Sequence, residues 1–105
     1  MPDTNVTYLL RCADGTYYCG WTTDPQARLR AHNRGRGAKY TRSRLPVALV
    51  YQEAWEDRHA ALSREWHLKR LSRAEKEALI REGQARAAGE KSPADSAAGT
   101  GKPFA

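Results

Sequence analysis

Four side chains in the first third of the chain carry groups that could accept or relay a proton and bind an anion. Tyr8 and Tyr18 carry phenols with an unperturbed pKa of about 10, so either could act as a base only beside a cation or a metal. Arg28 presents a planar fork of donors that fits a phosphate and could stabilise its developing charge. His32 titrates near neutral pH and could relay a proton.

Two strands joined by a tight turn are expected to hold the tyrosines. Residues 6–12 and 16–21 are rich in β-branched, aromatic and aliphatic side chains, and Ala13-Asp14-Gly15 between them is typical of a turn. Because side chains alternate along a strand, the length of the turn decides which of them share a face of the sheet.

A three-residue turn with Gly15 in the left-handed conformation would place both tyrosines on one face. It would pair Cys12 with Thr16, Leu10 with Tyr18, and Tyr8 with Gly20. A two-residue turn would instead pair Tyr18 with Arg11 and put the tyrosines on opposite faces. The residues of the turn favour neither alternative strongly.

A short helix is expected over residues 25–33. Asp24 can accept hydrogen bonds from free N–H groups as the N-cap, and Pro25 suits the first helical position. Arg28 and His32 are four residues apart, so this helix would present both side chains on one face.

The remaining segments predict the rest of one small domain. Residues 34–44 contain two glycines and five cations without apolar periodicity, which predicts a loop. Residues 47–53 predict a third strand, and residues 56–71 predict a helix with an acidic start. The capping-box pattern Ser72-Arg73-Ala74-Glu75 opens a last helix, which Gly83 is expected to end. This order predicts a mixed α/β, or α+β, fold in which helices flank a small three-stranded antiparallel sheet.

Residues 1–83 are therefore expected to form the domain and residues 84–105 a disordered tail, whose composition is dominated by Ala, Gly, Ser, Pro, Glu and Lys. The only cysteines, Cys12 and Cys19, have no metal-type spacing. No signal peptide and no apolar run of membrane-spanning length is visible, so we expect a cytoplasmic protein with reduced thiols.

Positive charge dominates the chain and favours partners that carry phosphate. Its 105 residues include 18 Lys and Arg against 12 Asp and Glu, for a formal net charge of +6. Seven of the cations fall within residues 28–44, where there is no acidic residue. DNA is the expected partner, with a merely solvated basic surface as the alternative. The sequence identifies no protein partner.

Tyr8, the run Tyr18-Cys19-Gly20, Arg28 and His32 together resemble the GIY-YIG nuclease superfamily, most closely its small stand-alone bacterial members. The resemblance covers about residues 6–80. In that family both motifs lie on neighbouring strands, and both tyrosines and the arginine line one active site, which favours the three-residue turn. The first motif here reads Val6-Thr7-Tyr8 without a glycine, and Cys19 replaces an isoleucine; in the family neither position carries the chemistry.

The resemblance also implies roles for single residues. Glu65 would bind a divalent metal, Mg²⁺ or Mn²⁺, although an ion pair with Lys69 four residues along would be the ordinary alternative. His32 would relay a proton, with a helix-end cap as its alternative. Gly20 would let substrate or a helix approach the strand, unless it marks a simple bulge. The predicted contacts with DNA are Asn33, Lys39, Tyr40, Arg42, Arg44 and Lys69, among which Tyr40 could stack on a base.

The resemblance therefore implies a metal-dependent DNA endonuclease for repair, recombination or other DNA processing, acting on single-stranded or branched DNA. A nucleic-acid-binding module without turnover, or one that needs a partner, is the first alternative. An adaptor that binds protein through the sheet edge or the second long helix is the other. The sequence does not choose between Tyr8 and Tyr18 as the group that accepts a proton from water.

Overall fold

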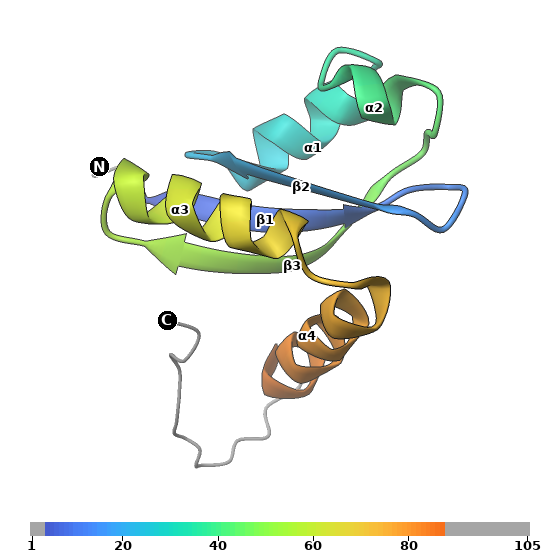
Figure 1. The fold of residues 1–105 in the computed structure, drawn as a ribbon. Coiled ribbons are helices and arrows are strands. Elements are labelled where there is room, and N and C mark those ends of the chain that lie inside the picture. Colours follow the sequence, from blue (N-terminus) through green and yellow to red (C-terminus); the bar gives the residue numbers. More distant parts are fainter. Residues whose placement is uncertain (1–3, 88–105) are drawn as a thin grey trace.

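A computed structural model describes residues 4–87 of the chain, which form a three-stranded sheet and four helices (Figure 1). The strands are β1 (Asn5–Arg11), β2 (Tyr17–Thr22) and β3 (Ala48–Trp55). The helices are α1 (Pro25–Asn33), α2 (Lys39–Arg42), α3 (Arg58–Lys69) and α4 (Arg73–Ala87). The predicted fold class, a small antiparallel sheet flanked by helices, is confirmed.

The sheet has the order β2-β1-β3, so β1 is central and β2 is an edge strand. Partners across β1 and β2 include Tyr8 with Gly20, Leu10 with Tyr18 and Arg11 with Tyr17. Gly15 has the left-handed conformation, and the Cys12 N–H donates to the Thr16 carbonyl at 2.8 Å. The turn is therefore the three-residue one, and it places Tyr8 and Tyr18 on the same face, as the resemblance implied.

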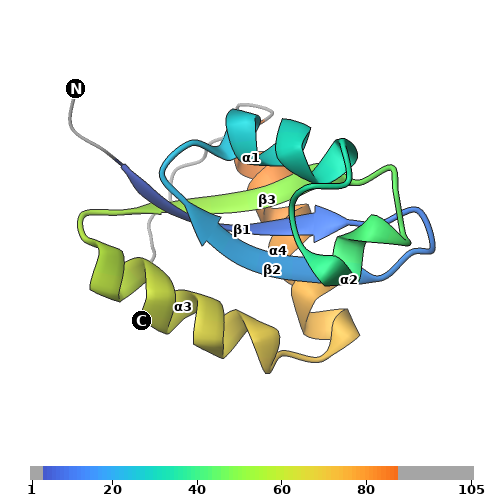
Figure 2. The ribbon, with the colours of Figure 1, turned by 90° about the horizontal axis from the view of Figure 1, so that it is seen from above.

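Separate layers of helices cover the two faces of this sheet (Figures 1 and 2). Tyr8 and Leu10 point into a core that Leu29 of α1 helps to cover. Leu9, between them in sequence, points the other way and packs with Leu68 of α3 and Ile80 of α4. Because side chains alternate along the buried strand β1, its neighbouring residues contribute to two separate cores, one on each face of the sheet.

Side-chain caps fix the starts of the three longer helices. Asp24 accepts a hydrogen bond from the Ala27 N–H at 3.1 Å, and Asp57 caps α3 in the same way. At α4 the Ser72 hydroxyl accepts from the Glu75 N–H at 3.1 Å while the Glu75 carboxylate accepts from the Ser72 N–H at 2.8 Å. The predicted N-cap of α1 and the capping box of α4 are both confirmed.

Two predicted boundaries are wrong. Within the expected loop 34–44, Lys39–Arg42 form one helical turn, because the buried Thr41 hydroxyl donates to the Ala38 carbonyl and anchors the turn. Helix α4 passes through Gly83 to Ala87, and a Cβ at Gly83 would lie 3.1 Å from the Tyr51 ring, so this glycine serves packing. The predicted tail therefore begins inside a helix, and its residues 88–105 lie outside the described residues. Among residues 4–87 no helix is both long enough and apolar enough to cross a membrane.

An ion pair between α3 and β3 fixes the position of α3. The guanidinium of Arg64 holds both carboxylate oxygens of Glu53, at 2.8 and 3.0 Å, and the Tyr51 hydroxyl donates to the same carboxylate. Both charged side chains are nearly buried, which makes this two-point contact more rigid than a surface pair. It sets the orientation of the helix that carries Glu65.

Candidate active site

The ring of Tyr8 crosses from β1 to the edge strand and lies against Gly20 of β2. A Cβ at Gly20 would be 2.6 Å from Tyr8 Oη and 3.2 Å from a ring carbon of Tyr18, so only glycine leaves room for the phenol. The register of β1 and β2 runs through Gly20 without a bulge. The sequence predicted that substrate or a helix approaches the strand at this glycine, whereas the structure places the Tyr8 side chain there. The bulge alternative is wrong.

Both ring nitrogens of His32 are engaged inside the molecule. Nε2 lies 3.1 Å from Tyr8 Oη, and Nδ1 lies 2.9 Å from Thr41 Oγ1, each at hydrogen-bond distance. A Cβ at Gly37 would be 2.1 Å from Nδ1, so this glycine lets the following loop close over the imidazole. His32 is fully buried and faces Tyr8, which rules out the alternative of a helix-end cap.

Burial shifts the pKa of both members of the Tyr8–His32 pair toward their neutral forms. It raises the pKa of Tyr8 to about 12, although a hydrogen bond and the charge of Arg28 act in the opposite direction. It lowers the pKa of His32 below the ordinary value of 6.5, and the positive charge of Arg28 adds to this shift. At neutral pH a neutral phenol therefore meets a neutral imidazole. Arg28 lies near enough to oppose the rise in the pKa of Tyr8, as a cation serving this site must.

Tyr18 borders the buried pair and is itself partly exposed. Its ring meets the His32 ring edge-on with 5.2 Å between centroids, and Tyr40 of α2 stacks on it at 6.0 Å. The Arg44 guanidinium lies over the Tyr40 ring at 3.9 Å and forms an ion pair with Asp14. Arg44, predicted to contact DNA, is thus held by the protein, and it stabilises the position of Tyr40.

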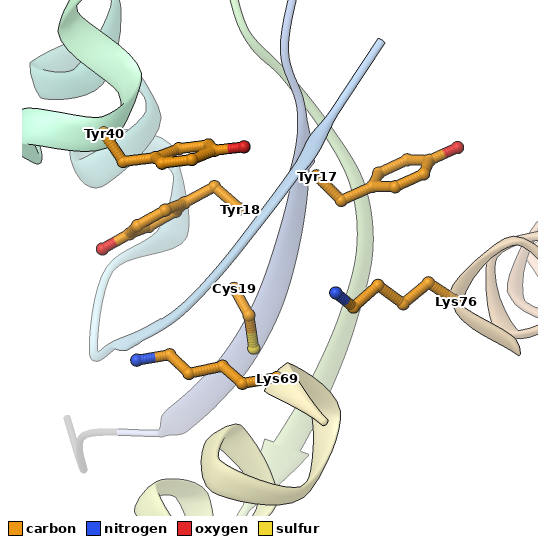
Figure 3. A pocket seen from close by; sticks show the side chains of 6 residues that line it. All are labelled: Tyr17, Tyr18, Cys19, Tyr40, Lys69 and Lys76. Carbon is orange, nitrogen blue, oxygen red and sulfur yellow. The ribbon is translucent and has the colours of Figure 1, made fainter. Parts of the chain in front are cut away.

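An open groove of about 260 Å³ follows β2 beside Tyr18 (Figure 3). The residues that line it are Tyr17, Tyr18, Cys19, Tyr40, Lys69 and Lys76. On one side of the strand the rings of Tyr18 and Tyr40 stack, and on the other lie Lys69 and Lys76 (Figure 3). Aromatic faces beside ammonium groups suit the bases and phosphates of a single nucleic-acid strand.

Glu65 supplies one carboxylate from α3. Its side chain is 16% exposed and its Oε2 lies 3.2 Å from Lys69 Nζ, so the ion pair considered as an alternative is formed. Its negative charge also raises the pKa of Tyr8, which places the carboxylate within electrostatic range of the phenol. No three His, Cys, Asp or Glu side chains gather as a metal cage within residues 4–87. Mg²⁺ commonly takes one or two carboxylates and fills its shell with water and phosphate oxygens, so Glu65 fits that kind of site.

The family model for the GIY-YIG catalytic domain matches residues 4–78. The chain belongs to the GIY-YIG family. A UPF0213 protein of Lacticaseibacillus paracasei is 52% identical, over 77% of this chain and 91% of the relative. A UPF0213 protein of Halobacterium salinarum is 54% identical, over 70% of this chain and 95% of the relative. The solution NMR structure of the protein EF2693 from E. faecalis is 34% identical, with a TM-score of 0.52 over 88% of this chain and 97% of that one. Membership makes this a domain of the nuclease class, in a small stand-alone family.

The residues that depart from the GIY-YIG motifs are divided between the two faces of the sheet. Val6, at the position of the missing glycine, is buried in the core that contains Tyr8, whereas Thr7 and Cys19 lie on the opposite face. Thr7 is buried, and its hydroxyl donates to the Ala61 carbonyl of α3 at 2.8 Å. Cys19 is buried among the apolar side chains below α3, and burial raises the pKa of its thiol to about 12. The replaced positions therefore serve packing, and the GIY-YIG tyrosines keep their arrangement.

The other residues predicted to contact DNA differ in whether their side chains are already bonded within the protein. Lys39 and Arg42 are exposed on α2 and form no ion pair within the described chain. The Asn33 amide accepts from the Val47 N–H at 2.8 Å and donates to the Val47 carbonyl at 3.0 Å, so it ties the end of α1 to the start of β3. The main role of Asn33 here is structural.

Two residues that position His32 in this GIY-YIG domain were not singled out from the sequence. Thr41 was noted only as part of a basic segment, and Gly37 only as a sign of a loop. A weak signal for Thr41 was present, because a threonine hydroxyl in a short turn can hydrogen-bond to a nearby backbone carbonyl and so hold that turn. The pairing of His32 with Thr41 still depends on how residues 33–40 close, which no local pattern predicts.

Proposed function

We propose that this protein is a metal-dependent endonuclease that hydrolyses phosphodiester bonds in DNA. The observation that carries the proposal is the contact of 3.1 Å between Tyr8 Oη and His32 Nε2, buried against Gly20 with Arg28 in reach. A buried structural tyrosine needs one hydrogen-bond partner, which any neutral acceptor can supply, whereas here the partner is a titratable imidazole and a cation lies beside the phenol. Membership of the nuclease class supports the same conclusion.

Each side chain has a distinct role in the proposed reaction. The attacking water loses a proton to the Tyr8–His32 pair, and its oxygen forms the new bond to phosphorus. The bond from phosphorus to the leaving sugar oxygen breaks, and that oxygen keeps the electron pair. Arg28 binds the phosphate oxygens, on which negative charge accumulates in the transition state.

Glu65 is the residue that would hold Mg²⁺ or Mn²⁺ in this proposal. When bound, such an ion would supply Lewis-acid catalysis at the phosphate and help to orient the substrate. Lys69, which now pairs with Glu65 at 3.2 Å, would then turn its ammonium group to a phosphate in the groove. This exchange of partners is consistent with Lys69 lining the groove as well as facing the carboxylate.

The groove supports a single-stranded or locally unpaired substrate, as found in branched DNA. Stacked rings such as Tyr18 and Tyr40 are useful only to bases that have left a duplex. Lys39 and Arg42 on α2 extend the positive surface next to those rings. We place its biological role in DNA repair, recombination or another DNA-processing step, with the cytoplasm as its location.

The test is cleavage of end-labelled DNA in single-stranded, duplex and flapped forms, with Mg²⁺, Mn²⁺ or a chelator. We expect cleavage that needs the metal and falls by at least about 100-fold in Arg28→Ala and in Glu65→Gln. Arg30→Ala is the matched control, because Arg30 is an exposed cation on the same helix. Its effect on cleavage should be small.

Salt-sensitive DNA binding without cleavage by any version would replace the endonuclease with a binding module. The same loss of activity in Arg30→Ala and Arg28→Ala would contradict a special role for Arg28. Cleavage unchanged by Glu65→Gln would remove Glu65 from the metal site.

A further inference from the structure

Thr41 is a fully buried threonine whose hydroxyl touches the catalytic pair from the side opposite Tyr8. Its Oγ1 donates to the Ala38 carbonyl at 3.0 Å and lies 2.9 Å from His32 Nδ1. The Ala38 N–H also points at the same oxygen, at 3.4 Å. The hydroxyl hydrogen is used by the carbonyl, which can only accept, and the oxygen lone pairs remain for the N–H groups.

This arrangement favours Nδ1 as the nitrogen of His32 that carries the hydrogen. With the Thr41 hydrogen directed at the Ala38 carbonyl, the short contact with Nδ1 is a hydrogen bond only if Nδ1 is the donor. A neutral imidazole has a single N–H, so Nε2 is then an acceptor.

The hydrogen bonds of Tyr8 lead independently to the same tautomer. The hydrogen-bond partner of its hydroxyl within residues 4–87 is His32 Nε2, at 3.1 Å, and the guanidinium of Arg28 acts on the same phenol through its charge. A guanidinium can only donate, so the phenolic hydrogen has one acceptor available, which is Nε2. Were Nε2 protonated, the buried neutral phenol would face a donor and its own hydrogen would be unsatisfied, at a cost that buried groups avoid.

Tyr18 has no comparable link to the imidazole. It meets His32 by an edge-on ring contact, with 5.2 Å between centroids, and no hydrogen bond joins the two side chains in the part of the chain that the structure describes. A proton taken up by Tyr18 would therefore have no direct path to His32, whereas one taken up by Tyr8 would.

We propose that Thr41 is a positioning residue that fixes His32 as the Nδ1–H tautomer. In this tautomer Nε2 accepts the Tyr8 proton, while Tyr8, rather than Tyr18, takes the proton of the attacking water. The catalytic half of this inference rests on the proposed endonuclease activity. In the step itself, the water proton moves to Tyr8 Oη as the Tyr8 proton moves to Nε2. The product is a neutral tyrosine and an imidazolium, and Thr41 Oγ1 stabilises that cation by accepting from Nδ1–H.

The tautomer can be read directly from long-range ¹H–¹⁵N NMR spectra of His32 at neutral pH, without DNA. We expect a protonated Nδ1 and a bare Nε2 in the wild type and in Thr41→Ser, which retains the hydroxyl. In Thr41→Val, which has nearly the same shape without a hydroxyl, the Nε2–H form should become detectable. Tyr8→Phe should keep the Nδ1–H form, because the contact with Thr41 remains.

Cleavage assays then test the consequence. Thr41→Val should lower kcat by about 10- to 100-fold with little change in KM, and Thr41→Ser should restore most of the loss. Should Thr41→Val fail to fold, the wild-type spectrum and Tyr8→Phe still decide the tautomer. A wild-type His32 protonated at Nε2, or a switch of tautomer in Tyr8→Phe, would overturn the inference.

The two proposals fail in different ways. A protonated Nδ1 in a protein that cleaves no DNA would contradict the endonuclease and leave the positioning role of Thr41 standing. Metal-dependent cleavage by a protein whose His32 is protonated at Nε2 would leave the endonuclease and remove Thr41. Cleavage that survives in Tyr8→Phe but not in Tyr18→Phe would overturn the choice of Tyr8.

Discussion

At the level of single residues, the candidate site joins a phenol that burial makes a weak acid to an imidazole that burial makes a weak base. Burial raises the pKa of Tyr8 to about 12 and lowers that of His32. Neither group alone would take a proton from water easily at neutral pH. In contact at 3.1 Å they can act together, since the phenol gives up one proton as it receives another.

The position of the Tyr8 phenol depends on the missing side chain at Gly20. We predict that Gly20→Ala reduces DNA cleavage by at least about 10-fold, because the new Cβ would lie 2.6 Å from Oη and displace it from His32. We also expect a loss of about 1–3 kcal/mol in the free energy of unfolding, the usual cost of overpacking a core. Initial cleavage rates and urea denaturation measure the two effects.

Gly20→Ala combined with Tyr8→Phe separates the two causes. Removing the hydroxyl removes the closest clash, so the double variant should regain part of the lost stability without regaining activity. Full activity in Gly20→Ala would show that the phenol does not need its present position.

At the level of the elements, local chemistry predicts where most helices begin, whereas tertiary packing decides where they end. The hairpin, the N-cap at Asp24 and the capping box at Ser72 follow from residue type and spacing, and all are present. Gly83 did not end α4, because the Tyr51 ring occupies the place of a side chain there. The turn of α2 was missed for a similar reason, since the buried hydroxyl of Thr41 holds it.

The capping box of α4 provides a test of local stabilisation. We predict that Ser72→Ala lowers the free energy of unfolding by about 0.5–2 kcal/mol, because the Glu75 N–H loses the acceptor that now lies 3.1 Å away. Ser63→Ala is the matched control, because Ser63 is exposed inside α3, where alanine is the better helix former. It should be neutral or slightly stabilising.

Urea-induced unfolding followed by circular dichroism gives both values. Equal destabilisation by Ser72→Ala and Ser63→Ala would contradict a specific role for the cap. An unchanged midpoint in both variants would mean that packing against the core holds α4 without help from the cap.

Over the whole molecule, the catalytic residues were easier to predict than the DNA-binding surface. Tyr8, Tyr18, Arg28 and His32 lie within 25 consecutive positions, and the geometry of a hairpin and one helix brings them together. The net charge predicted a negatively charged partner, but it did not show which cations are free to bind it. Arg44 is held by Asp14 and Tyr40, whereas Lys39 and Arg42 are unpaired within residues 4–87.

That difference leads to a prediction about the dependence of DNA binding on salt. Each phosphate contact removed should reduce the slope of log affinity against log salt by about 0.7 for a single strand. We therefore expect Lys39→Ala with Arg42→Ala to reduce the slope by about 1.4. The matched control is Arg81→Ala with Arg86→Ala, which removes two exposed cations from α4 and likewise lowers the formal net charge from +6 to +4.

Fluorescence anisotropy of a labelled single strand between low and moderate salt measures both slopes. If the surface beside Tyr40 binds the backbone, the α2 variant loses slope and the α4 variant retains it, since α4 lies below the sheet and α2 above it (Figure 1). Equal losses in the two variants would mean that only the net charge of the molecule attracts DNA. In that case the stacked tyrosines would remain as the feature that selects an unpaired strand.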